Sequence, residues 1–301
     1  MKHFLFSLLL SLAAAYCSGQ DLKIWHKYKP GSKYKFEYVK LTSGAKYAGK
    51  TLTGITQYDL IVDKEDIAGI HVKWKIGPTE ISGLDAAELE KIKPLLNINK
   101  DFELQLLLNK EGKIIGLENY EACQEHIKKI LVMLTGLMAN QITADISAQL
   151  DAVVAATTSD ASLLLTSYFP EISLYFELYG QSYSDGVFYV MESLTPLGFD
   201  NLFAPFQTNI KVTKTPGKNT EIDLAMLCNQ GILNGANEQM GDPGADWVKF
   251  ISETKDRQIQ INKNYSINAV SRMVEGLTLK KSVVLGGQTA TEEVRLRLLK
   301  S

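Results

Sequence analysis

The sequence has few of the residues from which most catalytic and metal-binding sites are built. It contains four histidines and three cysteines among its 301 residues. It lacks the G-x-S-x-G motif that positions a hydrolase nucleophile and the H-E-x-x-H motif of zinc enzymes. Gly286-Gly287 falls in an expected hairpin turn, without the following helix that a phosphate-binding loop needs. We therefore predict a protein that is not an enzyme and that holds no metal and no cofactor.

The sequence also lacks an excess of charge of one sign. Its 32 Lys and Arg residues nearly balance its 34 Asp and Glu residues, which gives a net charge of −2. Such a chain has no general field that attracts polyanions, so we expect no nucleic-acid partner. Hydrophobic residues make up 45% of the chain, which excludes intrinsic disorder as a description of the whole.

The apolar run near the start of the chain, Phe4–Ala15, is short for a membrane anchor, which is the weaker of two interpretations. Twelve residues span about 18 Å as a helix, whereas the hydrocarbon layer of a bilayer is roughly 30 Å thick. A basic start and small residues after the run are typical of a secretory signal peptide. We predict that residues 1–19 are removed before Gln20. The mature chain is then exported to the periplasm, the cell surface or the outside, with no transmembrane span.

The three cysteines bear on anchoring and on disulfide formation. A lipid anchor on Cys17 is the alternative to cleavage before Gln20, but Tyr16 stands where lipoprotein signals carry a small residue. Removal of the leader leaves Cys123 and Cys228, an even pair in a compartment that permits disulfides. The alternative is that each packs as a small hydrophobic side chain. The sequence favours neither interpretation.

The first part of the mature chain alternates apolar and polar residues with period two, which predicts antiparallel strands with one wet face. The alternation is clear over residues 33–38, 70–76 and 102–108, and residues 51–62 are rich in β-branched and aromatic side chains. The turn after residue 108 is expected to return the chain as a hairpin. We define a strand set over residues 33–117. Within it, Asp85 and Glu88 predict a capping box for a short helix that Pro94 ends.

Helical periodicity begins after Asn119, the expected N-cap, and continues to about Ala156. It predicts one long helix, or two helices broken near Gly136, in a helical segment over residues 119–165. Between residues 130 and 170 three aspartates are the only charged residues. Such an apolar segment needs a cover. We expect the protein's own sheet rather than a membrane or a partner groove, because basic residues on its polar face are missing.

Strand patterns return in a second set over residues 172–300. Alternation is visible over residues 172–178, 221–227 and 291–299, and a further amphipathic helix is expected over residues 245–255. Strands, helices and strands in that order predict an α+β fold. We expect a large curved antiparallel sheet that packs on the long apolar helical segment. The sheet consists of two strand sets or forms a half-barrel. Residues 20–301 then form a single body, for which we favour one continuous sheet over two related lobes.

The polar residues that could carry chemistry have plain structural interpretations. Cys123 and His126 are three residues apart on the expected helix, and Glu121 and Glu125 lie within two turns of His126. A catalytic pair also needs an orienting group and a cleft, and a zinc site usually needs more than one histidine. His71 falls on the polar side of its strand and is expected to be solvated.

The layout resembles that of exported β-rich proteins of uncharacterised function that are common in Bacteroidota. The resemblance is carried by Tyr28–Phe36 after the leader, by Phe102–Leu106, by Lys110–Ile114 and by Tyr265–Ile267. A curved antiparallel sheet around helices is also similar in layout to the half-barrels of LolA-like lipoprotein carriers. The LolA-like resemblance implies a lipid-binding cavity, but no residue motif.

These observations predict a non-enzymatic cell-envelope protein. We expect it to bind an apolar, lipid-like ligand or an extended envelope partner in a concavity between sheet and helices. The expected pocket lining is Ile130, Leu134, Leu137, Met138, Ile142 and Ile146. The first alternative is a structural or interaction protein with a fully packed core. The second is an extracytoplasmic hydrolase, which the missing motifs disfavour.

Overall fold

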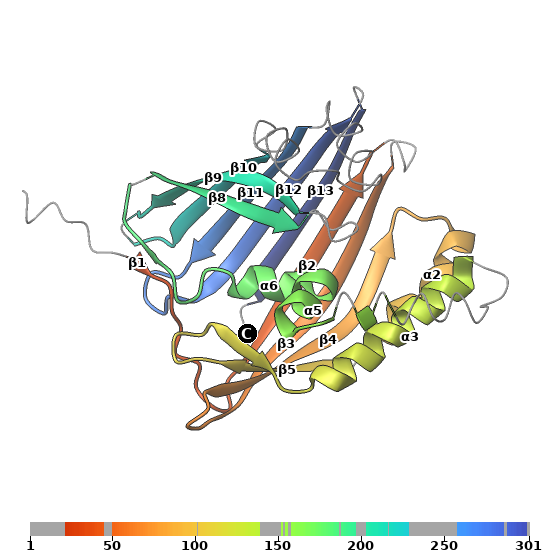
Figure 1. Cartoon of the computed structure of the whole chain (residues 1–301), viewed down its shortest axis with the longest axis horizontal. Helices are drawn as coiled ribbons and strands as arrows, with labels where there is room; N and C mark the ends of the chain where they lie inside the picture. Colours follow the sequence, from red (N-terminus) through yellow and green to blue (C-terminus); the bar gives the residue numbers. More distant parts are fainter. Residues whose placement is uncertain are drawn as a thin grey trace, which may run out of the picture.

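A single large antiparallel sheet dominates the computed structural model, and its helices lie against one face (Figure 1). The structure describes residues 22–44, 50–100, 102–138, 152, 154–155, 158–186, 188–196, 203–215, 217–228, 258–285 and 288–299. In these residues the sheet has eleven strands, in the order β6-β5-β4-β3-β2-β13-β12-β11-β10-β9-β8. A separate pair joins β1 (Leu22–Lys23) to β7 (Ser182–Tyr183).

Both predicted strand sets are present in the sheet. The first consists of β2 (Lys33–Ser43), β3 (Thr51–Glu65), β4 (Ile70–Ser82), β5 (Glu103–Leu108) and β6 (Ile114–Leu117). The second consists of β8 (Phe188–Pro196), β9 (Phe203–Thr213), β10 (Thr220–Cys228), β11 (Gln258–Ile267), β12 (Val274–Leu285) and β13 (Gln288–Leu299). They join where β13 pairs with β2, with Phe36 opposite Leu298. The predicted continuous sheet is therefore confirmed.

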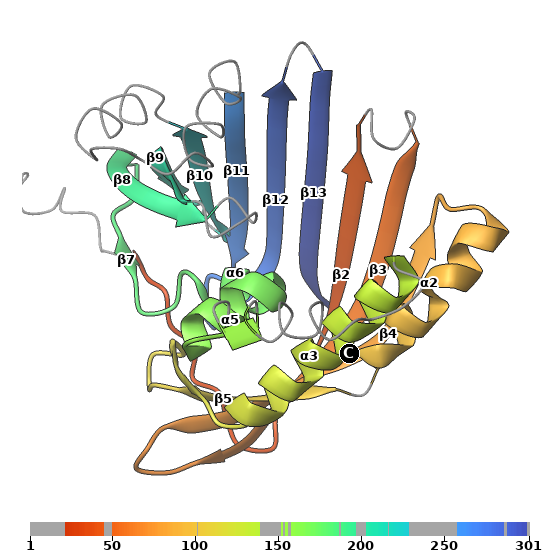
Figure 2. The ribbon, with the colours of Figure 1, turned by 45° about the vertical axis from the view of Figure 1, so that its right-hand side comes forward.

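Four helices have both ends within the described residues: α2 (Ala86–Ile98), α3 (Tyr120–Met138), α5 (Ala161–Tyr168) and α6 (Pro170–Phe176). The sheet curves around α5 and α6, while α2 and α3 pack against each other beside β4 (Figure 2). The predicted capping box of Asp85 and Glu88 is present. Pro94 lies inside α2 instead of ending it. No residue of α2 is buried, so the helix lies at the surface.

Residues 172–178, predicted as a strand, are helical in their first part. Pro170 opens α6, and Ile172, Tyr175, Phe176 and Tyr179 are all buried. Their spacing of three, four and seven residues is that of one helix face. The strand prediction counted the two tyrosines as polar. Their rings instead fill the core, and their hydroxyl groups hydrogen-bond to each other, 3.2 Å apart.

The long apolar helix is not shown by the structure. In the described residues α3 ends at Met138, and residues 139–151 of the predicted helical segment lie outside the description. The first half of α3 is anchored in the core by Cys123 and Ile127. Its second half carries exposed Val132 and Leu134. The sheet, which was predicted to pack over this segment, therefore leaves these two side chains exposed.

The main core lies between the sheet and α5 and α6, around aromatic rings. Trp74 of β4 is fully buried, and its ring centroid lies 5.5 Å from that of Phe36 and 5.5 Å from that of Tyr175. Tyr58 of β3 lies 5.6 Å from Trp74. Aromatic contacts at such distances add to the hydrophobic gain from burial. The sheet face that bears Phe36 and Trp74 is called the inner face below, and the opposite face is the outer face.

Candidate functional site

The inner face carries charged side chains beyond the part covered by the helices. Along β2 the inward positions read Phe36, Tyr38 and then Lys40. The neighbouring inward positions on β13 and β12 are Glu292 and Lys281, which are directly paired. Lys40 Nζ lies 3.0 Å from Glu292 Oε2. Burial lowers the pKa of Lys281, partly offset by the charge of Glu292. We call Lys40, Lys281 and Glu292 the charged row.

A second apolar cluster lies on the inner face on the far side of the charged row. It consists of buried Phe206, Met226, Ile259 and Ile261, with Cys228, Leu279 and Val283 packed against them. All of these residues belong to strands β9–β12. The strand register places Ile261 directly opposite Lys281, so the cluster and the charged row touch along one line of the sheet. We call these seven residues the upper cluster.

A buried carboxyl group lies below the charged row, at the start of α6. Glu171 is 7% exposed, and the hydroxyl group of Tyr58 donates a hydrogen bond to its Oε1 at 3.1 Å. Burial raises the pKa of Glu171 to about 7, against the opposing effects of the Tyr58 hydrogen bond and the charge of Lys40. The charge of Glu171 in turn adds to the effect of burial in raising the pKa of Tyr38.

The predicted pocket lining is only partly described. Ile130 is half-buried, and Leu134 is 37% exposed. Leu137 and Met138 belong to α3, but their side chains lie outside the description, as do Ile142 and Ile146 altogether. A pocket formed by these residues therefore stays a prediction. Sequence reasoning missed the charged row, although alternation along each strand places its three side chains on the inner face.

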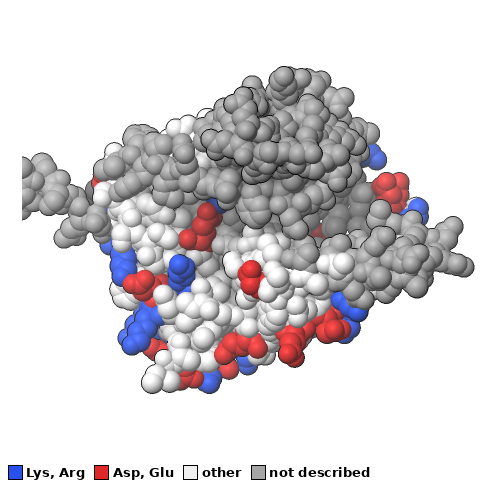
Figure 3. Space-filling model, in the orientation of Figure 1, with Lys and Arg blue, Asp and Glu red and all other residues white. Residues whose placement is uncertain are grey.

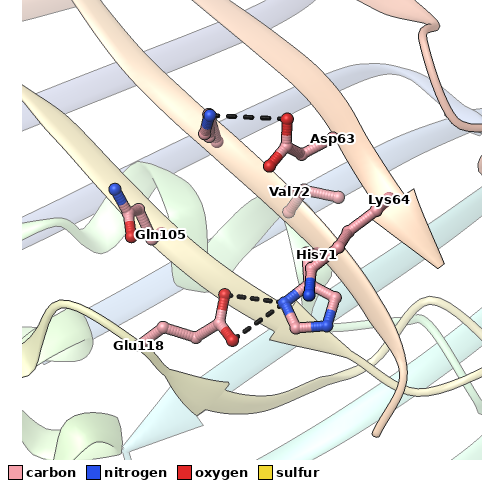
Figure 4. Close-up of a pocket in the computed structure, with 7 residues that line it drawn as sticks. Asp63, Lys64, His71, Val72, Gln105 and Glu118 are labelled. Atoms are coloured by element: carbon pink, nitrogen blue, oxygen red, sulfur yellow. Dashed lines mark hydrogen bonds and ion pairs between the residues drawn. The ribbon is translucent and has the colours of Figure 1, made fainter. Parts of the chain in front are cut away.

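A charged hollow of about 250 Å³ lies on the outer face, where β3 turns into β4 (Figure 4). His71 Nδ1 lies 2.8 Å from Glu118 Oε1, and its Nε2 lies 3.0 Å from Asp66 Oδ2. Lys64 and Lys73 pair with Asp66 and Asp63 at 2.9 and 3.4 Å. Each charge thus has an opposite partner. We interpret the hollow as an ion-pair network that ties the β3–β4 turn to the end of β6.

His71 was predicted to be solvated, and this was wrong. It lies on the predicted face of β4 but is only 9% exposed, because Asp66 and Glu118 flank its ring. Both carboxylates come from outside β4, so strand parity alone could not place them. Hydrogen bonds to Glu118 and then to Asp66 raise the pKa of His71.

We expect His71 to titrate above pH 6.5 and His126 well below it. The raised pKa means that His71 stabilises the fold below pH 6.5 and loses this effect as the pH rises through its folded-state value. Glu118→Gln is expected to lower the pKa of His71 and to leave His126 unchanged. An NMR titration of the histidine rings measures all of these values. A pKa of His71 at or below 6.5 in the unmodified chain would contradict the ion-pair network.

The other two described histidines are held by neutral partners. His126 Nε2 lies 2.8 Å from Asn99 Oδ1, and its ring stacks on Phe102 at 3.7 Å. Burial and Lys129 lower the pKa of His126 to about 4. His26 lies 3.1 Å from the hydroxyl group of Tyr34. Within the described residues no histidine is hydrogen-bonded to a serine, threonine or cysteine side chain, and no group of three or more candidate ligands could hold a metal ion.

Both described cysteines are free thiols in the structure. Cys123 is fully buried in the main core, and burial raises the pKa of its thiol to about 12. Cys228 is half-buried at the upper cluster. A disulfide between the two stays one of the two alternatives that the sequence leaves open.

Acidic and basic side chains are interspersed along the lower rim of the described surface in Figure 3. In the described part of the chain no helix is both long and apolar enough to cross a membrane.

Comparisons with known proteins leave the family open. No protein-family model matches the chain, and no curated protein matches it. A structure of lipovitellin, determined for its lipid–protein interactions, is similar over 91% of this chain at 8% identity and a TM-score of 0.44. The match covers 25% of the lipovitellin chain, so the present chain spans about a quarter of its length. A porin-like protein from Bacteroides uniformis matches 91% of this chain and 99% of its own at 7% identity, with a TM-score of 0.17. None of these comparisons identifies the exported Bacteroidota proteins or the LolA-like carriers.

Proposed function

We propose that the protein binds an amphipathic, lipid-like molecule with an acidic head group on the inner face of its sheet. The observation that carries the proposal is the contact between the upper cluster and the charged row. A packed core excludes charges, because moving an ion out of water costs several kcal/mol unless it is paired. Here charged residues occupy inward positions between two apolar regions. Such a boundary fits a ligand that is apolar at one end and charged at the other.

The half-buried members of the upper cluster, Cys228, Leu279 and Val283, provide the apolar contact for such a ligand, and the buried members support them from below. Each methylene group of an acyl chain that leaves water contributes roughly 0.8 kcal/mol. The cluster spans the four strands β9–β12, so an extended chain lying across it would cross the strands. Backbone hydrogen bonds between these strands hold the apolar residues in fixed positions, which reduces the entropic cost of binding.

The charged row provides the contact for the head group. Its two lysines, Lys40 and Lys281, are donors for an acidic group on the inner face. A carboxylate or phosphate ester placed beside Lys281 would form an ion pair with it. It would also raise the pKa of Lys281, which burial lowers in the unliganded protein.

Two further parts of the proposal come from the sequence. We propose that the chain is exported after removal of residues 1–19, and that it acts by binding without catalysing a reaction. The three described histidines are each held by a partner in the fold, which supports the second part.

The proposal predicts that Lys281→Gln weakens the binding of a fatty acid about tenfold and leaves the binding of the corresponding fatty alcohol unchanged. A tenfold change corresponds to about 1.4 kcal/mol, within the range of a charge-assisted hydrogen bond. Competition against a fluorescent fatty acid measures both affinities. Lys280→Gln is the matched control, because Lys280 is the preceding residue on β12 and points to the outer face.

Native mass spectrometry of the purified mature protein, followed by organic extraction, identifies any ligand that is carried through purification. A bound lipid-like mass is the expected result. The bare protein mass, together with no fatty acid binding at micromolar concentrations, would overturn the proposal and favour the interaction protein with a packed core. Equal effects of Lys281→Gln and Lys280→Gln would remove the role of the charged row.

A further inference from the structure

The outer face of β9–β12 has a second hollow, of about 320 Å³. Its floor is Ala225, which lies directly between Asn209 on β9 and Asn262 on β11. The next line of the sheet places Asp223 between Lys211 and Asn264. Thr278 and Lys280 of β12 complete the wall. The short side chain of Ala225 thus leaves a depression among longer polar ones.

This part of the outer face differs from the rest of it in composition. Over β2, β3 and β13 the outer face carries cross-strand ion pairs, such as Arg297 with Glu37 at 2.9 Å and Lys33 with Asp59 at 2.8 Å. The hollow around Ala225 is instead lined by three asparagines, Asn209, Asn262 and Asn264, together with Lys211, Asp223, Thr278 and Lys280. Asparagine is disfavoured in strands, and these three asparagines on β9 and β11, on either side of β10, lower local stability without a packing gain. Residues that break local preferences in this way are expected at functional or strained sites.

Strands β10 and β11 are also held by a contact between side chains. Asn264 Nδ2 donates a hydrogen bond to Asp223 Oδ1 at 2.7 Å. Asp223 lines the hollow, and a carboxylate with one oxygen engaged keeps further acceptor capacity. Because β9, β10, β11 and β12 are paired through their backbones, the polar groups around Ala225 are fixed relative to one another.

We propose that this hollow binds a saccharide. A primary amide offers one acceptor and two donors, which match two neighbouring hydroxyl groups of a sugar ring. Asn209 and Asn262 lie on opposite sides of Ala225, whose methyl group can contact the C–H face of the ring. Asn262 Oδ1 accepts a hydrogen bond from Gln260 Nε2 at 3.4 Å, so the Asn262 amide offers its two donors to a sugar. Asp223 accepts hydrogen bonds from hydroxyl groups, and Lys211 and Lys280 donate. The volume lies at the lower end of the range of small-molecule sites, enough for one or two sugar rings.

The saccharide site is independent of the proposed lipid site. The residues of the hollow point away from the sheet face that carries the upper cluster. Binding of a sugar therefore does not require an occupied inner face. Lys281→Gln should leave sugar binding unchanged, which separates failure of one proposal from failure of the other.

The test is a screen of the full chain against neutral and acidic oligosaccharides, followed by calorimetry with those that bind. Ala225→Ile fills the hollow with a side chain that strands favour, so it removes the space without opposing the fold. Asn262→Ala removes one amide. We expect each change to weaken binding at least tenfold. Thr53→Ile, which adds the same side chain on the outer face of β3, is the control and should have no effect.

The screen also separates two kinds of sugar. If the protein prefers acidic oligosaccharides, we infer that Lys211 pairs with the acidic group of the sugar. Lys211→Gln should then remove that preference. Equal binding of neutral sugars would assign recognition to the amides. No saccharide bound at millimolar concentration would overturn the proposal. Binding that Ala225→Ile and Asn262→Ala leave unchanged, with thermal unfolding like that of the unmodified chain, would also overturn it.

Discussion

Replacing Trp74 with alanine is expected to lower the free energy of unfolding by about 3–5 kcal/mol, the usual cost of removing a large buried aromatic side chain. Trp74 is fully buried, and its ring contacts rings from β2, β3 and α6. The change therefore leaves a cavity where the sheet meets the helices. Urea unfolding followed by circular dichroism measures the loss.

Trp74→Phe is the matched control for this prediction. Phenylalanine keeps an aromatic ring at the centre of the core but removes the indole N–H. In the described part of the chain Trp74 Nε1 has no hydrogen-bond partner. Its removal therefore relieves an unsatisfied donor, which offsets part of the lost volume. We expect Trp74→Phe to cost much less than Trp74→Ala. Equal costs would contradict the packing described for this ring.

Glu171→Gln is expected to stabilise the protein at pH 8 by about 3 kcal/mol and to change its stability little at pH 4.5. Burial raises the pKa of Glu171 to about 7. The folded chain therefore keeps a proton that the unfolded chain releases between about pH 4.5 and 7, so stability falls as the pH rises through this range. Each unit of pKa shift corresponds to about 1.36 kcal/mol. Glutamine removes the cost of the buried charge and still accepts the hydrogen bond from Tyr58.

Denaturant unfolding at a series of pH values between 4.5 and 8 tests this prediction. The difference between Glu171→Gln and the unmodified chain should grow across the range and level off above pH 7. Glu125→Gln on the exposed face of α3 is the control, and a surface change of this kind should alter stability by less than about 0.5 kcal/mol at every pH. If the free energies of unfolding of Glu171→Gln and the unmodified chain differed by the same amount at every pH, the carboxyl group of Glu171 would be in contact with water, against the prediction.

Strand alternation predicted most of the sheet because one face of each strand is buried. The inward side chains of β2, β4, β5 and β13 follow the predicted parity. From the sequence, the two strand sets could form one continuous sheet or two related lobes. Alternation says which face a residue occupies and not which strand lies beside it, so it did not predict the pairing of β2 with β13. The helix at 170–176 was missed because tyrosine has an apolar ring and a polar hydroxyl group. Tyr175 therefore fits both the alternation of a strand and the apolar face of a helix.

The candidate sites were less accessible to sequence reasoning. The upper cluster and the charged row come from strands that are distant in the chain, and only the register places Ile261 next to Lys281. His71 is buried by carboxylates from a turn and from the end of β6. The hollow around Ala225 depends on neighbours from three other strands. The charged row gave a signal through alternation, because Lys40 continues the inward series of Phe36 and Tyr38, and Glu292 continues that of Leu296 and Val294.

The pairing of Phe36 with Leu298 has a consequence for how the molecule assembles. Strands β2 and β13 pair in the middle of the sheet although more than 240 residues separate them in the chain, so the sheet cannot be completed before β13 has been synthesised. Until then β2 presents an unpaired edge, which is a site for aggregation. Contacts between such distant parts of a chain also make folding slow. We expect the nascent chain to need protection by a chaperone until β13 is available.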